Sequence, residues 1–250
     1  MRLPSLLVVP AAIGLSATSA HAARVINFNS LPVGLAVSEQ IEGVSISALN
    51  PYNGVPDEAV VFDFNNDRFV DSGQSGPPWS MGNIDLDTNL GNGLVVGGAR
   101  RSEGIPFETR RPAGDLLFRF DAPLTSFGFT MVDVEGPEEF VTDTGFFVEF
   151  GSGDAIIDTF DFADLVTPGT MLYDPDIQFG NRSANRIAPI TAAMLGVESF
   201  DFVEISIGGS AVVAQITIDD TGNATAIPTP TAAAGGLALL GLALNRRRPR

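Results

Sequence analysis

Acidic side chains with the spacing of a calcium loop lie in the stretch DFNNDRFVD. Asp63, Asn65 and Asp67 occupy every second position, and Asp71 follows them. Carboxylate and amide oxygens at this spacing are the ligands that Ca²⁺ takes in oxygen-rich loops. The stretch departs from the standard loop, because an arginine replaces the turn glycine and no glutamate closes the loop. It predicts a candidate Ca²⁺ site, and solvated acids on a strand are the alternative interpretation.

A second candidate site combines two pairs of acids that are far apart in the chain. Asp85 and Asp87 share one face if the stretch NIDLD is extended, because side chains alternate along a strand. Asp219 and Asp220 end the last predicted strand. We expect the two pairs to meet and to hold a structural Ca²⁺, which is the only cofactor that the sequence indicates.

Residue types needed for most catalytic sites are missing. The chain has no cysteine, its 14 basic residues are all arginines, and His21 is its only histidine. Because His21 belongs to a predicted signal peptide, the mature protein lacks the residues of Cys–His and Ser–His–Asp sites, of histidine metal sites and of Schiff-base lysines. The sequence therefore predicts a protein that is not an enzyme.

Two carboxylates alone suffice for one remaining reaction, the hydrolysis of a glycosidic bond. The acids Asp133, Glu135, Glu138 and Glu139 lie near one another in an apparent loop. They match no catalytic signature, so glycoside hydrolysis is the weaker alternative.

Aromatic side chains suggest a carbohydrate-binding module as another alternative. Exposed Trp and Tyr rings stack on sugar rings, and the chain offers Trp79, Tyr52 and Tyr173. Trp79, in the loop GQSGPPWSMGN, is the best candidate for a ligand contact, with a buried loop anchor as the other interpretation.

The charge of the chain excludes one class of partner. Between the predicted end segments, nine arginines face 30 acidic residues, a formal charge of −21. Such a surface repels phosphate backbones, so we expect no nucleic-acid partner.

Period-two patterns dominate residues 23–222 and predict half-buried strands. In GVSIS, Val44 and Ile46 face one side. In DLLFRFD and SFGFTM, the phenylalanines alternate with polar or small residues. In SFDFVEISI the apolar phase changes after Phe202, which predicts a β-bulge. About ten strands at this spacing favour an all-β fold, a two-sheet β-sandwich of the jelly-roll type.

The N-terminal segment 1–22 has the features of a secretory signal peptide. Arg2 precedes an apolar run, and Ala20 and Ala22 flank His21 in an A-x-A cleavage pattern. We expect cleavage after Ala22 and export of the remainder.

The C-terminal segment combines three features in order. The linker 223–231 contains Pro228, Thr229 and Pro230, and an apolar stretch with a basic end follows in residues 232–250. That stretch predicts a short hydrophobic helix, and its basic end contains Arg246, Arg247 and Arg248. By the positive-inside rule these arginines stay cytoplasmic while the domain is held outside, which predicts transient membrane insertion.

The stretch IPTPTAAAGGLALLGLALNRRRPR resembles the PEP-CTERM sorting domain of exported bacterial proteins. In that family a Pro-Glu-Pro motif precedes a short apolar helix and an arginine cluster, and an exosortase-type membrane protease processes the tail. Here Thr229 stands in place of the central glutamate. The body, from INFNSLPVGLAVSEQIEGVSIS to AVVAQITIDD, is similar to the β-sandwich ectodomains that precede such tails.

The resemblance implies a protein of the cell surface or extracellular matrix. We expect a structural or adhesive role in association with exopolysaccharide, with an exosortase-type protease as the processing partner.

Overall fold

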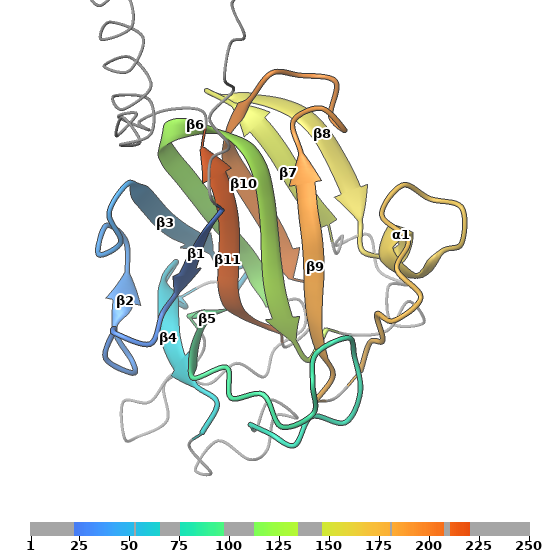
Figure 1. Ribbon diagram of the computed structural model, residues 1–250. Coiled ribbons are helices and arrows are strands. Elements are labelled where there is room, and N and C mark those ends of the chain that lie inside the picture. Colours follow the sequence, from blue (N-terminus) through green and yellow to red (C-terminus); the bar gives the residue numbers. More distant parts are fainter. Residues whose placement is uncertain are drawn as a thin grey trace, which may run out of the picture. The chain divides into compact units, whose positions relative to one another are not determined.

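The computed structural model describes residues 23–52, 54–65, 76–97, 113–134, 147–180, 182–207 and 211–220. All of them belong to one compact unit, Ala22–Gly222 (Figure 1). The two terminal segments, with Ala20, Ala22, the motif at Pro228–Pro230 and the arginines 246–248, lie outside the described residues. Within the described residues, no helix is of a length and hydrophobicity that would span a bilayer.

The described chain is almost entirely extended, and the prediction of an all-β fold is confirmed. Its elements are β1 (Arg24–Asn27), β2 (Ala36–Val37), β3 (Val44–Leu49), β4 (Ala59–Asp63), β5 (Asn92–Val96), β6 (Gly114–Val132), β7 (Phe147–Ser152), β8 (Ala155–Asp161), α1 (Ala163–Val166), β9 (Ala184–Thr191), β10 (Phe200–Ile207) and β11 (Val212–Asp220). All strand pairs are antiparallel and belong to one sheet, with the order β2-β4-β5-β11-β6-β10-β7-β8.

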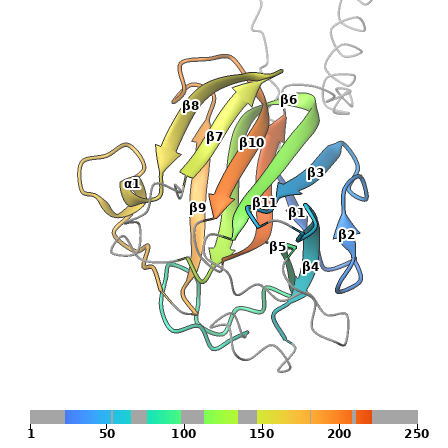
Figure 2. The same cartoon turned by 180° about the vertical axis from the view of Figure 1, so that it is seen from behind.

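Strand β6 organises this sheet. The sequence predicted two separate strands in DLLFRFD and SFGFTM, but they form one strand of 19 residues. Its first half pairs with β3 and β10, and its second half pairs with β9 and β11 (Figures 1 and 2). The register shifts near Leu124, where β10 and β11 both end their pairing with β6. The intervening APLT stretch therefore redirects β6 without ending it.

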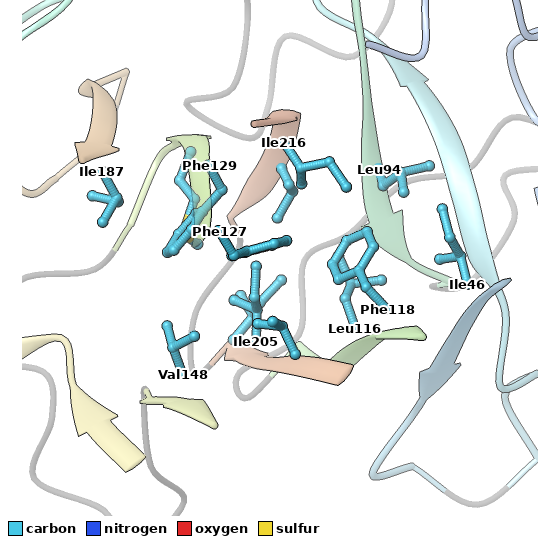
Figure 3. Packing of buried hydrophobic residues seen from close by; sticks show 14 of the residues in the cluster. Ile46, Leu94, Leu116, Phe118, Phe127, Phe129, Val148, Ile187, Ile205 and Ile216 are labelled. Atoms are coloured by element: carbon cyan, nitrogen blue, oxygen red, sulfur yellow. The ribbon is translucent and has the colours of Figure 1, made fainter. Parts of the chain in front are cut away.

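The main core lies between the two halves of β6. Phe127, on the second half, has its ring centroid 6.0 Å from Phe118 and 6.1 Å from Phe120, both on the first half. It also lies 6.4 Å from Phe150 of β7. Figure 3 shows Phe127 in the middle of the cluster, among Phe129, Ile205 and Ile216. The predicted inward-facing phenylalanines are thus core residues.

A second, smaller core covers the other face of β4, β5 and the neighbouring ends of β6 and β11. In β4, Val61 contributes to the main core, whereas Val60 and Phe62 contribute to the second one. Side chains alternate between the two faces of this strand, and both faces are buried. Trp79, Ile84 and Leu90, from the loop between β4 and β5, provide the outer cover.

The predicted bulge in SFDFVEISI is confirmed. The register between β10 and β6 shifts between Phe200 and Phe202. Phe200 faces the core, where its ring lies 5.1 Å from Phe150. Phe202 lies on the outer face, 5.0 Å below the Arg119 guanidinium.

The first and last strands of the body are neighbours. Arg24 pairs with Ile218, and Asn27 pairs with Gln215, so the start of β1 lies beside the end of β11 (Figure 1). Both ends of the described chain therefore leave the sheet at the same end of one strand pair.

Candidate functional site

The first candidate calcium site is described only in part. Asp63 ends β4, and its Oδ1 accepts a hydrogen bond of 2.9 Å from the backbone N–H of Asn65. The Asn65 amide donates to Asn89 Oδ1 at 3.2 Å. Asp67 and Asp71 lie outside the described residues. The structure therefore places the first predicted ligand at the end of β4 and the second in the turn that follows, and the calcium loop stays a prediction.

The second candidate calcium site is not assembled. Asp85 and Asp87 lie in a turn that contacts the Trp79 loop, because the Trp79 N–H donates to Leu86 O at 2.8 Å. Trp79 belongs to the same buried cluster as Val212 at the start of β11, whereas Asp219 and Asp220 end that strand. Seven residues of extended chain separate the two ends by roughly 23 Å.

The prediction that the two acidic pairs meet was therefore wrong. The alternation in NIDLD belongs to a turn rather than to a strand, and β11 carries Asp219 and Asp220 away from it. Among the parts of the chain that the structure describes, no three acidic, His or Cys side chains gather as metal ligands would.

Trp79 is buried, which corrects its assignment as a ligand contact. Its side chain is 2% exposed, and its Nε1–H donates to Thr88 O at 2.9 Å. Its ring stands edge-on to Phe64 at 5.6 Å. A sugar ring has no access to the indole faces, so Trp79 anchors the loop that covers the second core.

Asp133, one of the four acids considered for glycoside hydrolysis, is also buried. It is 2% exposed, and its Oδ1 accepts from the Arg182 N–H at 3.2 Å. Its carboxylate thus binds the backbone of the segment before β9. Glu135, Glu138 and Glu139 lie outside the described residues.

A pocket of about 310 Å³ is lined by residues of α1, of the loop that follows it and of β9. Its floor consists of the core residues Leu165, Ile177 and Ile187. Exposed side chains form its rim: Met171, Tyr173, Pro175, Ala188 and Pro189. A concave site with an apolar floor and few polar groups has the general form of a small-molecule site.

Two aromatic or apolar side chains of this rim are unusually exposed for their type. Met171 is 61% exposed, and Tyr173 is 39% exposed. The roles of the aromatic candidates are thereby reversed: Trp79 is a core residue, and Tyr173 presents its ring at a pocket.

Asp174 supplies a fixed polar group at the same pocket. Its Oδ2 accepts from the Asn83 amide at 3.2 Å, and its Oδ1 accepts from the Asp176 N–H at 2.9 Å. Asn83 is itself held by β9, since it bonds both the N–H and the carbonyl of Arg186. The carboxylate is thus held in one orientation by two groups, of which Asn83 is itself fixed to β9.

Neither a protein-family model nor a curated protein matches this chain.

The outer face of the sheet holds a cluster of carboxylates that the sequence did not reveal. Glu204 of β10 is directly opposite Glu149 of β7, and Asp115 of β6 lies nearby, where its Oδ1 accepts from Ser206 at 2.6 Å. Each acid occupies a polar position of a period-two strand. Only the strand pairing, which the sequence does not specify, brings them together.

Burial is the main cause that raises the pKa of the Glu204 carboxyl above its ordinary value of 4.5. The negative charges of Asp115 and Glu149 raise it further, and Arg119 partly offsets them. The folded state therefore binds this proton more readily than the unfolded state. The Glu204 carboxyl therefore contributes to stability at pH values below about 4.5, and this contribution is lost as the pH rises through the folded-state pKa.

We expect Glu204→Gln to stabilise the protein at pH 7, because it removes the cost of a half-buried charge beside two like charges. Thermal melts should show a Tm increase of about 1–2 °C at pH 7 and none at pH 4. Glu198→Gln, in the exposed turn before β10, removes the same formal charge and serves as the control. An equal gain from both variants would assign the effect to net charge alone.

Proposed function

We propose that this chain is an exported protein of the cell surface or extracellular matrix, with a structural or adhesive role in association with exopolysaccharide. The terminal segments direct it there: a signal peptide in residues 1–22, and a PEP-CTERM-like sorting signal in residues 223–250. An exosortase-type protease is the proposed processing partner, after transient membrane insertion of the C-terminal hydrophobic helix. The body carries out no catalysis.

One observation most directly supports the division of the chain into two removable terminal segments and a folded body. The hydrogen-bonded sheet begins at Arg24 and ends at Asp220, and the compact unit is Ala22–Gly222. Cleavage after Ala22 and within the tail would therefore remove no strand and no core residue of the described body. A body bounded in this way tolerates processing at both ends, as a sorted surface protein requires.

We further propose that the sheet is arranged as a two-layer sandwich with jelly-roll connectivity. The contacts of Phe127 with Phe118 and Phe150 support two facing layers, since these residues come from strands on either side of the turn in β6. The second core supports the same arrangement, because it lies on the face of β4 and β5 that is turned away from the main core.

A carbohydrate-binding module is the second candidate function, and the pocket at Tyr173 favours it. An exposed tyrosine beside a fixed carboxylate is a common combination for sugar recognition. The two candidates are compatible, because a matrix protein can hold polysaccharide through such a site. Calcium is the proposed structural or bridging ion.

Two measurements on the protein recovered from its host test the proposal. Intact mass should show a chain that begins at Ala23 and lacks residues 237–250. The same protein should sediment with the extracellular polysaccharide of the host, and chelation of Ca²⁺ should weaken the association if the ion acts as a bridge. A protein that keeps both terminal segments and does not sediment with polysaccharide would contradict the proposal.

A further inference from the structure

We propose that the pocket at Tyr173 binds a neutral sugar ring of a polysaccharide chain. This inference deepens the proposed function and rests on it, because it gives the association with exopolysaccharide a site and a chemical class. Neither the spacing of the acidic residues nor the terminal segments indicated this site.

The volume of the pocket suits one or two sugar rings. Its volume of about 310 Å³ is at the lower end of the range for small-molecule sites. Leu165, Ile177 and Ile187 belong to the main core, so the floor is rigid and does not need to order when a ligand binds. Tyr173 and Pro189 both line the pocket and are exposed.

The rim offers the contacts that the apolar faces of a sugar ring require. Tyr173 presents an aromatic ring with a polar tip, which can stack on C–H groups and bond a hydroxyl at the same time. Met171 and Pro175 extend the apolar surface beside it. A tyrosine also loses little conformational entropy on binding, which suits it to recognition surfaces.

Asp174 offers the polar contact. An ionised carboxylate has about four lone-pair sites, of which Asn83 and the Asp176 N–H use two. The remaining sites accept hydrogen bonds, and sugar hydroxyls are donors in pairs on adjacent carbons. Because Asn83 fixes the carboxylate, these acceptors are oriented before the ligand arrives, which lowers the entropic cost of binding.

Charge restricts the ligand to neutral sugars. Asp174 is the only charged residue among the described residues that line the pocket, and the body has a formal charge of −21. A uronic acid or a sulfated sugar would bring a like charge to the carboxylate. The same net charge disfavours a second copy of this chain as the occupant, because two such bodies repel each other.

Binding of trisaccharides of glucose, galactose and mannose, measured by saturation-transfer NMR and titration calorimetry on the host-derived protein, tests the inference. At least one of the three should bind, and a trisaccharide of galacturonic acid should not. Tyr173→Ala should weaken the affinity at least tenfold, and Asp174→Asn should weaken it several-fold.

Tyr52→Ala is the matched control, because Tyr52 lies in the loop after β3 and does not line the pocket. This variant should bind like the wild type. Absence of binding by all three neutral trisaccharides, or equal affinity in wild type and Tyr173→Ala, would overturn the inference.

Sedimentation with host polysaccharide separates this inference from the function on which it rests. If wild type and Tyr173→Ala sediment equally, the association with polysaccharide stands and the pocket is not its site. If neither sediments but a neutral trisaccharide binds at Tyr173, the pocket is a sugar site and the proposed matrix role fails. If only the wild type sediments, both are supported.

Discussion

Phe127→Ala is expected to destabilise the protein by about 3–5 kcal/mol, the usual cost of replacing a buried phenylalanine by alanine. Phe127 is fully buried and contacts the rings of Phe118, Phe120, Phe129 and Phe150. Its loss would leave a cavity at the place where the two halves of β6 face each other. Since small proteins are stable by only about 5–15 kcal/mol, the variant should be close to the limit of folding.

Urea denaturation measures this effect, and a thermal melt should show a Tm lower by about 8–16 °C. Leu49→Ala is the control, because Leu49 is 58% exposed at the end of β3. It should change stability by less than about 0.5 kcal/mol. A loss below about 1 kcal/mol for Phe127→Ala would contradict the assignment of this residue to the centre of the core.

Gly82→Ala is expected to release the loop that covers the edge of β9, with a loss of about 2–4 kcal/mol. Gly82 has a φ of +108°, which residues with a Cβ rarely adopt. An added Cβ would also overlap the carbonyl oxygen of Ala184 on β9. Next to Gly82, Met81 O accepts from the Ala184 N–H at 2.9 Å, so the clash falls on a backbone contact that cannot move freely.

Trp79 reports on this loop, because it is the only tryptophan of the chain and belongs to the same loop, with its side chain buried. In Gly82→Ala its fluorescence should shift to longer wavelength at a urea concentration below that of global unfolding. Gly169→Ala is the matched control: its φ is +97°, but no atom lies within 4 Å of the added Cβ. It should cost about 1 kcal/mol from backbone strain alone. Equal effects of the two variants would contradict the role of the contact with Ala184.

Strand positions and facing directions could be predicted from the sequence, because they depend on neighbours in the chain. The alternation of Val44 and Ile46 in β3 and the phase change at Phe202 both correspond to observed structure. Two features depended on distant segments instead. The strands around Leu124 join into one strand, and β4 is buried on both faces by a loop that follows it.

The pocket at Tyr173 and the carboxylate cluster could not be predicted either, because they too depend on segments that are distant in the chain. Trp79 and Tyr173 both lie in loops rich in proline and glycine, and nothing local distinguishes a ring that faces a core from one that faces a pocket. Whether Asp85 and Asp219 meet depends on which chain segments lie side by side, which the sequence does not specify. The opposition of Glu149 and Glu204 required the register between β7 and β10, which 54 intervening residues do not specify.

The pairing of β1 with β11 has a mechanical consequence. Tension between the two ends of the body would act at one end of this antiparallel pair and peel its bonds apart one after another, starting at Arg24 and Ile218. Tension on Asp220 along the axis of β11, against a partner held elsewhere on the body, would instead load a strand that is bonded to β6 over nearly its whole length. That load is shared by many bonds at once, so a body tethered through its C-terminal end resists force better than one stretched between its own ends.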